Sequence, residues 1–168
     1  VYLISGPTYL QPIQGANIIK VNSAKQMYSK VMEYYNQADI VIKSAAVSDY
    51  APAITSTEKI KKDGEELSIR LEKNPDILYE LGKTKGNKIL VGFAMETENL
   101  MENAREKVRK KNLDFIVANN LRTEGAGFGH DTNVVKIIDK HGNIESLPIM
   151  TKLELADIII NKVISLTC

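Results

Sequence analysis

Apolar and polar positions in the first quarter of the chain follow the pattern of a strand, a helix and a strand. Val1–Ser5 and Ile18–Val21 are short apolar segments that predict strands. Ser23 can cap a helix that runs to about Asn36, because apolar residues then recur at helical spacing. The continuous apolar run Ile40–Ile42 predicts a strand that is buried on both faces, as in a parallel sheet. This order is typical of a βαβ unit.

The rest of the chain continues the alternation. Leu67, Ile69 and Leu71 alternate with polar residues, which predicts a strand with one exposed face. Thr151 and Glu154 have the spacing of a capping box at the start of a last helix that runs to about Leu166. The other expected elements are a helix from Asn74 to about Gly82, a strand at Ile89–Phe93, a helix from Thr97 to about Lys111, a strand at Asp114–Ala118 and a hairpin of 133–139 with 144–149.

Together these elements predict an α/β fold with a Rossmann-like, doubly wound, mostly parallel sheet and a late β-hairpin. Ligands of such sheets bind beyond the carboxyl ends of the strands. The segments that follow predicted strands are Ser44–Asp49, Phe93–Thr97 and Ala118–Asn120, so we expect these three turns to converge. Ser44–Lys62 is too long for a simple connection and is expected to form a functional, extended arm.

The composition is that of one globular domain over residues 1–168. Hydrophobic residues make up 43% of the chain and charged residues 26%. No apolar run approaches the roughly 18 residues of a membrane span, and the N-terminus lacks the features of a signal peptide. The one cysteine, Cys168, excludes an internal disulfide and fits a reducing, cytoplasmic location. His130 and His141 have few potential ligands near them, which disfavours a zinc or iron site and leaves metal ligands unassigned.

Asp49 and Lys59 are the first candidates for chemistry. Asp49 follows the small residues Ser44–Ala46, where a ligand can approach the backbone, and its carboxylate can accept hydrogen bonds from a base amino group or ribose hydroxyls. An Asx turn that satisfies only its own loop is the alternative. Lys59 belongs to a lysine cluster suited to phosphate, although the same pattern is typical of a solvated edge strand protected against aggregation.

Two further segments are suited to anions. Lys107 and Lys111 lie one helical turn apart and can contact a triphosphate together, unless they simply belong to a solvated helix face. In Asn74-Pro75-Asp76, Asn is expected at the N-cap and Pro at the first helical position, and the free N–H groups there favour anions. Asp76 can itself complement that dipole.

The glycine-rich turn of a dinucleotide fold is not found. No G-x-G-x-x-G motif follows the first strand, where Gly6-Pro7 stands instead. We therefore expect this chain to lack the N-terminal strand, glycine-rich turn and helix of its domain.

Six segments, in uninterrupted order, are similar to a known family. They are SAAVSDYAP (Ser44–Pro52), EKIKK (Glu58–Lys62), LEKNPDIL (Leu71–Leu78), VGFAMET (Val91–Thr97), AREKVRKKNLDFIVAN (Ala104–Asn119) and FGHDTNVV (Phe128–Val135). With them the chain resembles phosphopantothenate–cysteine ligase, the C-terminal domain of the bacterial bifunctional coenzyme A biosynthesis protein.

The resemblance implies a two-step ligation. CTP, with magnesium, activates the carboxylate of 4′-phosphopantothenate as an acyl-cytidylate and releases pyrophosphate. The amine of L-cysteine then attacks and gives 4′-phosphopantothenoylcysteine and CMP. A homodimer is implied as well, because the arm that carries Glu58–Lys62 contacts a second protomer in this family. FMN is not expected, because the flavin-dependent decarboxylase domain that usually precedes the ligase is not in this chain.

Site residues follow from the same resemblance. Lys59 is the implied catalytic residue, on the arm that closes over the nucleotide and the intermediate, and Asp49 reads cytosine or its surroundings. An upstream asparagine that helps bind phosphopantothenate is absent, so part of that substrate site is expected to be missing. The residues implied for CTP binding are Ser44, Ala45, Asp49, Lys59, Pro75, Asp76, Ile77, Leu78, Phe93, Lys107 and Lys111.

Two other functions compete with the ligase. An NAD(P)-dependent reductase of Rossmann type needs a G-x-G-x-x-G turn and an acidic residue for the ribose, and neither is visible. A nucleic-acid binder would show a strong positive charge and exposed aromatic platforms. The net charge of +1, with seven tyrosines, three phenylalanines and no tryptophan, argues against nucleic acid as a partner.

Overall fold

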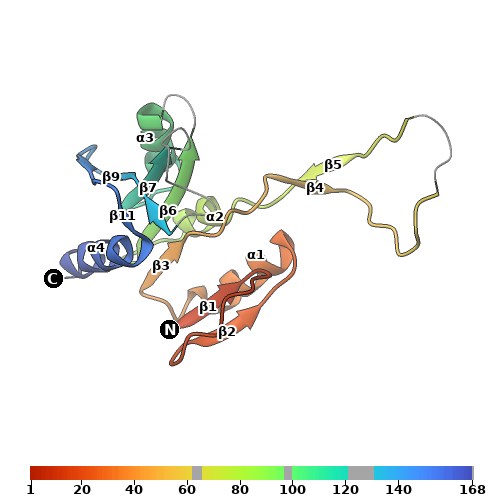
Figure 1. Ribbon diagram of the computed structural model, residues 1–168, viewed down its shortest axis with the longest axis horizontal. Helices are drawn as coiled ribbons and strands as arrows, with labels where there is room; N and C mark the ends of the chain where they lie inside the picture. Colours follow the sequence, from red (N-terminus) through yellow and green to blue (C-terminus); the bar gives the residue numbers. More distant parts are fainter. Residues whose placement is uncertain (62–65, 97–99, 121–130, 168) are drawn as a thin grey trace. The chain divides into compact units, whose positions relative to one another are not determined.

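The computed structural model describes residues 1–61, 66–96, 100–120 and 131–167. The chain divides into two compact units. Unit 1 comprises Val1–Glu33 and Ala46–Asp76, and unit 2 comprises Tyr34–Ala45 and Ile77–Cys168. The single-domain organisation expected from the sequence stays a prediction. Figure 1 shows the elements of both units along the chain.

Unit 2 is built around a five-stranded sheet with the order β10-β9-β7-β6-β3. Three strands are mutually parallel, and the β9–β10 hairpin adds to them antiparallel. Gly142 has a φ of 86° in the turn of this hairpin, a conformation that glycine adopts without strain. The strands are β3 (Ile40–Lys43), β6 (Ile89–Glu96), β7 (Phe115–Asn120), β9 (Val135–Asp139) and β10 (Ile144–Ser146). The late hairpin predicted from the sequence is confirmed.

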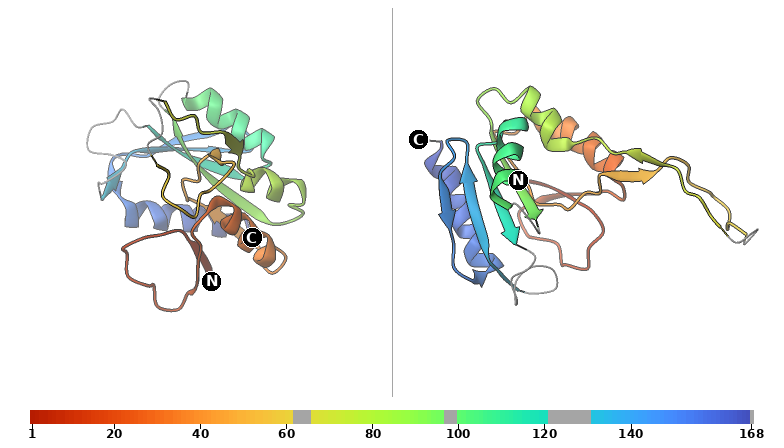
Figure 2. Two further views of the ribbon diagram at one scale, coloured as in Figure 1. Left: turned by 90° about the vertical axis from the view of Figure 1, so that its right-hand side faces the viewer. Right: turned by 90° about the horizontal axis from the view of Figure 1, so that it is seen from above.

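Helices cover both faces of this sheet. They are α2 (Ile77–Lys83), α3 (Leu100–Lys110) and α4 (Lys152–Ser165). The buried face of α4 packs into one core cluster with alternate residues of β6, β7 and β9, among them Val91 and Phe115. Ala104 and Val108 of α3 are buried as well, and α3 contacts the same strands. Figure 2 (left) shows α3 and α4 on opposite sides of the sheet, which confirms the doubly wound prediction.

The start of α4 has the predicted capping box. Thr151 Oγ1 accepts from the Glu154 backbone N–H at 3.2 Å, and Glu154 Oε2 accepts from the Thr151 N–H at 2.8 Å. Two orphan donors of the helix terminus are satisfied in this way. Thr151 also ends β11 (Met150–Thr151), which pairs with the two-residue strand β8 (Thr132–Asn133).

The prediction that Ile40–Ile42 is buried on both faces is wrong. β3 is the edge strand of the sheet, and Ile40 and Ile42 remain 39% and 37% exposed. A short apolar run fits an edge strand and a central strand equally well, because it does not specify how many neighbours the strand has.

Unit 1 contains a second, two-stranded sheet of parallel strands. β1 (Tyr2–Ser5) pairs with β2 (Asn17–Lys20). Helix α1 (Ala24–Tyr35) follows, and Ser23 Oγ accepts from the Gln26 N–H at 3.2 Å, which confirms the predicted cap. The predicted βαβ unit is corrected, since β2 and β3 on either side of α1 belong to different sheets.

The segment after β3 forms the arm that was predicted. β4 (Tyr50–Pro52) pairs antiparallel with β5 (Leu71–Lys73), and Figure 1 shows residues 53–61 and 66–70 between them as extended chain. The predicted strand over Leu67–Leu71 is wrong for its first half, because pairing begins only near Arg70, whose carbonyl accepts from Ala53 N. Alternation alone does not make a strand where no neighbouring backbone is available.

Within the described ranges, no helix combines the length and apolar character needed to cross a membrane.

Candidate functional site

The predicted site residues fall in both units. Asp49, Lys59, Pro75 and Asp76 belong to unit 1, and the rest of the set belongs to unit 2: Ser44, Ala45, Ile77, Leu78, Phe93, Lys107 and Lys111. The unit boundaries after Ala45 and after Asp76 each divide one of the predicted binding segments.

Asp49 is held by its backbone and leaves its carboxylate exposed. Its carbonyl accepts from the Asn74 N–H at 2.8 Å, and the carbonyl of Ser48 accepts from Asn74 Nδ2 at 2.9 Å. In the described part of the chain, the Asp49 carboxylate makes no hydrogen bond or ion pair. The Asx-turn alternative, in which this carboxylate bonds its own loop, has no support among these contacts. A fixed backbone with a free carboxylate is suited to ligand recognition.

A cavity of about 640 Å³ lies beside this segment in unit 1. Ser48, Tyr50 and Asn74 line it together with the start of α1, whereas Asp49 does not. Lys25 of α1 pairs with Glu72 of β5 at the edge of the cavity, and the hydrogen bond from Lys25 lowers the pKa of Glu72.

In unit 2 the carboxyl ends of the parallel strands lie side by side. Lys43 is opposite Gly92, so Ser44 and Ala45 leave β3 at the level of Phe93, and Glu96 is opposite Asn120. These pairings confirm the predicted convergence of the three turns for residues 44, 45, 93–96 and 118–120. Phe93 is half-buried and packs against the core cluster under α4. Thr97, the last residue of one turn, lies outside the described residues.

Lys107 and Lys111 lie in and just beyond the last turn of α3. Both are half-buried, while Arg105 and Arg109 are exposed, so the two lysines share a face that the arginines do not. Because α3 connects parallel strands β6 and β7, it runs back against their direction, and Lys111 lies close to the start of β7. The structure therefore does not bring Lys111 to the carboxyl ends of these strands.

The helix that follows Asn74 begins later than predicted. α2 starts at Ile77, so Asp76 takes the position before the first helical residue, and Asn74 is left to bond Ser48 and Asp49 instead. Pro75 is half-buried and Asp76 exposed. Ile77 and Leu78 are buried in the core, so only their backbone groups remain for a ligand.

Lys59 lies on the extended arm and is exposed. Residues 59–61 do not form a strand, so the predicted edge strand is not found there. Lys62, the last residue of the lysine cluster, lies outside the described residues.

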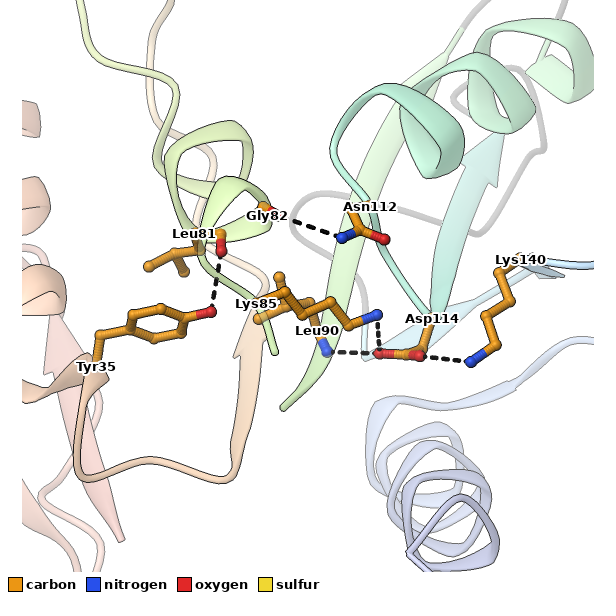
Figure 3. A network of polar contacts seen from close by, with 8 residues as sticks. All are labelled: Tyr35, Leu81, Gly82, Lys85, Leu90, Asn112, Asp114 and Lys140. Atoms are coloured by element: carbon orange, nitrogen blue, oxygen red, sulfur yellow. Dashed lines mark hydrogen bonds and ion pairs between the residues drawn. The ribbon is translucent and has the colours of Figure 1, made fainter. Parts of the chain in front are cut away.

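An ion network around the buried Asp114 carboxylate lies at the amino ends of β6 and β7, away from their carboxyl ends (Figure 3). The Asp114 carboxylate accepts from Lys85 Nζ at 2.7 Å, from Lys140 Nζ at 3.1 Å and from the Leu90 N–H at 2.9 Å. Burial raises the pKa of Asp114, but these hydrogen bonds outweigh it and leave the pKa below its ordinary value. Every member has a partner and the group lies where the strands begin, so we interpret this network as structural.

In the described ranges no three histidine, cysteine or acidic side chains gather as a metal site. His141 lies in the β9–β10 turn, and its backbone N–H donates to Asp139. His130 lies outside the described residues.

Two asparagines were not among the predicted site residues. Asn74 is 7% exposed and Asn119 of β7 also 7%, and in the part of the chain that the structure describes each has a buried Oδ1 without a partner. The signal in the sequence was an asparagine at the carboxyl end of an apolar segment, directly after β5 for Asn74 and near the end of β7 for Asn119. A buried amide at such a position is costly unless it makes hydrogen bonds.

Parallel strands with helices on both faces, and polar residues at their carboxyl ends, place unit 2 in the Rossmann-like class of α/β folds. The chain belongs to the family described as DNA/pantothenate metabolism flavoprotein C-terminal domain, which matches residues 1–166.

Curated relatives are similar over almost the whole chain. It is 45% identical to the coenzyme A biosynthesis bifunctional protein CoaBC of Bacillus subtilis over 99% of its length, and 44% identical to CoaBC of Borreliella burgdorferi over 93%. It is also 46% identical, over 99%, to a cysteine/cysteine sulfinic acid decarboxylase from an unknown prokaryotic organism. The chain spans less than half of each relative: 41%, 40% and 47%.

Solved structures share the fold. The C-terminal domain of a CoaBC aligns with a TM-score of 0.79 and 37% identity, over 96% of this chain and 71% of that one. The DNA/pantothenate metabolism flavoprotein from Streptococcus pneumoniae aligns with a TM-score of 0.80 at 22% identity, over 98% of this chain and 80% of that one, which shows similarity of fold alone.

Proposed function

We propose that this chain is the ligase part of a coenzyme A biosynthesis enzyme, which joins 4′-phosphopantothenate to L-cysteine at the expense of CTP. The observation that carries the proposal is its 37% identity, over 96% of its length, to a solved C-terminal domain of CoaBC. The cytoplasmic location expected from the sequence is part of the same proposal.

Asp49 is proposed to recognise the base or ribose of CTP. Its carboxylate is exposed and its backbone is fixed by Asn74, so it can accept hydrogen bonds from an amino group or hydroxyls without rearrangement. Ser44 and Ala45 follow the carboxyl end of β3 at the level of Phe93 in β6, and α/β sheets bind nucleotides beyond the carboxyl ends of their strands. Pro75, Asp76, Ile77 and Leu78 would contribute mainly backbone groups.

Lysines are proposed to stabilise the negative charge of the reaction. When the pantothenate carboxylate attacks the α-phosphate, charge gathers on the phosphate oxygens and on the leaving pyrophosphate. Positioned cations lower the energy of that transition state. Lys59, on the extended arm, is the proposed catalytic cation. Lys107 and Lys111 are proposed as triphosphate ligands on the resemblance alone, since Lys111 lies near the start of β7 and not at the carboxyl ends of the strands. The cysteine amine then displaces CMP from the acyl-cytidylate.

Magnesium is proposed to arrive with the triphosphate. The described residues form no cage of three carboxylate, histidine or cysteine ligands, which fits a metal bound mainly through phosphates and water. No residue of this chain is assigned to it, and no FMN is assigned either.

A homodimer is proposed because the arm exposes apolar side chains. Leu67 and Ile69 are 68% and 61% exposed, and Ile54 and Ile60 are exposed too. Apolar side chains gathered on one extended segment mark an interaction surface, and a second protomer is the partner that the resemblance implies.

Two other activities are not proposed. The comparisons give no support to a nicotinamide-dependent reductase. The decarboxylase that one relative is named for is not transferred, because the chain spans only 47% of that protein and the resemblance places flavin-dependent decarboxylation in the part before the ligase.

The test is ligation by the complete protein with CTP, 4′-phosphopantothenate, L-cysteine and magnesium. We expect CMP, pyrophosphate and phosphopantothenoylcysteine in equal amounts by mass spectrometry, and stabilisation by CTP that exceeds that by ATP or NAD in thermal shift. Absence of CMP would overturn the ligase.

Lys59→Gln is expected to slow turnover far more than it weakens CTP binding, whereas equal losses in turnover and binding would mean that Lys59 only binds phosphate.

A further inference from the structure

We propose that Asn74 is a positioning residue for Asp49, and that its side chain sets the direction in which the Asp49 carboxylate meets the nucleotide. The inference rests on the proposed function of Asp49. Asn74 stands directly after β5, and it donates twice to the segment that carries Asp49: its backbone N–H to the Asp49 carbonyl and its Nδ2 to the Ser48 carbonyl.

These two bonds act on the two peptide groups that flank one Cα. The Ser48 carbonyl belongs to the peptide before Asp49, and the Asp49 carbonyl to the peptide after it. The orientations of these peptide planes define φ and ψ of Asp49, and so the direction of its Cβ. With only the backbone bond, the preceding peptide is free to rotate, and an exposed aspartate then samples several directions.

The burial of Asn74 supports a function for its amide donor. Asn74 is 7% exposed, and its Oδ1 is buried without a partner among the described residues. An unpaired buried oxygen is unfavourable, so packing alone would favour an apolar residue at this position. The bond from Nδ2 to Ser48 is what the asparagine supplies and an apolar residue does not.

A double-mutant cycle in the complete protein tests the proposal. The quantity measured is kcat/KM with CTP divided by kcat/KM with ATP, for wild type, Asp49→Ala, Asn74→Ala and the double variant. We expect Asn74→Ala to lower this ratio about tenfold, and the double variant to match Asp49→Ala alone, because a residue that acts through Asp49 has no effect without it. Independent, additive losses would overturn the proposal.

Tyr35→Phe is the matched control. Tyr35 Oη also donates to a buried backbone carbonyl, that of Leu81, at 2.9 Å, but in unit 2. We expect this variant to lower Tm and to leave the CTP/ATP ratio unchanged. If Tyr35→Phe and Asn74→Ala lower the ratio alike, loss of stability rather than positioning explains both.

Asn74→Leu is the second variant. It keeps roughly the size of the side chain and the backbone bond, removes the donor and adds no charge. We expect the same loss of ratio as in Asn74→Ala, and a wild-type ratio would overturn the proposal. If neither Asn74 variant folds, as judged by circular dichroism, Asn74 is a folding residue and the proposal fails.

Failure of the proposed function is distinguishable. If wild type makes no CMP, the ligase itself is excluded. If wild type uses CTP and ATP equally, the KM for CTP replaces the ratio as the quantity compared among the four proteins. Additive changes in that KM would still overturn the positioning role.

Discussion

Asp114 links three segments of unit 2 through its carboxylate. Lys85 follows α2, Leu90 is in β6 and Lys140 follows β9, so one side chain joins elements far apart in the sequence. The two lysines differ in environment, since the Lys85 side chain is 9% exposed and the Lys140 side chain 49%. Breaking a buried ion pair leaves an uncompensated charge, whereas losing an exposed pair costs little.

Removal of Lys85 is therefore expected to be much more damaging than removal of Lys140. Lys85→Met should lower the free energy of unfolding by about 3 kcal/mol, because the buried carboxylate keeps only part of its compensation. Lys140→Met, the matched control on the same carboxylate, should cost about 1 kcal/mol or less. Urea unfolding followed by circular dichroism measures both, and equal costs would contradict the assigned roles.

The same carboxylate makes stability depend on pH. The pKa of Asp114 in the folded protein lies below the ordinary value of 3.8. Its contribution to the free energy of unfolding is therefore complete above pH 3.8 and is lost as the pH falls through the lower, folded pKa. The difference in unfolding free energy between wild type and Asp114→Asn should thus be larger at about pH 6 than at about pH 3. Asp139, whose pKa is also lowered, is present in both proteins and cancels. A difference that grows towards acid would contradict the prediction.

At the scale of elements, the contact between α2 and the end of α3 depends on the absence of a side chain. A Cβ built on Gly82 would lie 2.2 Å from the carbonyl oxygen of Lys111, and Asn112 Nδ2 donates to the Gly82 carbonyl at 3.1 Å. The obstacle is backbone, which does not rotate away. Gly92 differs, because a Cβ there would meet the ends of the Leu113 and Leu78 side chains at 2.9 Å.

Gly82→Ala is expected to destabilise the protein by about 3 kcal/mol, although alanine favours a helix over glycine by about 1 kcal/mol. Gly92→Ala, the control, should cost about 1 kcal/mol, because flexible side-chain ends can adjust. Both are measured by thermal unfolding. A neutral or stabilised Gly82→Ala would show that helix propensity outweighs the steric contact between the two elements.

At the scale of the whole molecule, substitution of the exposed apolar residues of the arm tests whether the arm forms the dimer interface. If a second protomer covers Leu67 and Ile69, as proposed, Leu67→Glu with Ile69→Glu should raise the Kd of the dimer about tenfold or more, because charge would be buried in an apolar interface. Analytical ultracentrifugation of the complete protein measures this. Leu153→Glu on α4, also at an exposed leucine, is the control. An unchanged Kd in the arm variant would place the interface elsewhere.

Local patterns predicted the elements of this chain well. The capping box of Thr151 and Glu154, the cap at Ser23 and the late hairpin all formed as predicted, because each depends on residues within a few positions of one another. The order of strands and helices likewise predicted a doubly wound sheet. The residues assigned to CTP came from family resemblance, and Asp49, Lys59, Lys107 and Lys111 keep those roles as predictions.

The sequence by itself thus determined most of the helices and the longer strands, and which residues carry charge suited to a nucleotide. Only the tertiary structure decided that Ile40–Ile42 is an edge strand, that Lys111 lies near the start of β7, and that Asn74 binds the carbonyls of Ser48 and Asp49. The physical reason is that local patterns act between near neighbours, whereas strand neighbours, burial and hydrogen-bond partners depend on residues far apart in the sequence.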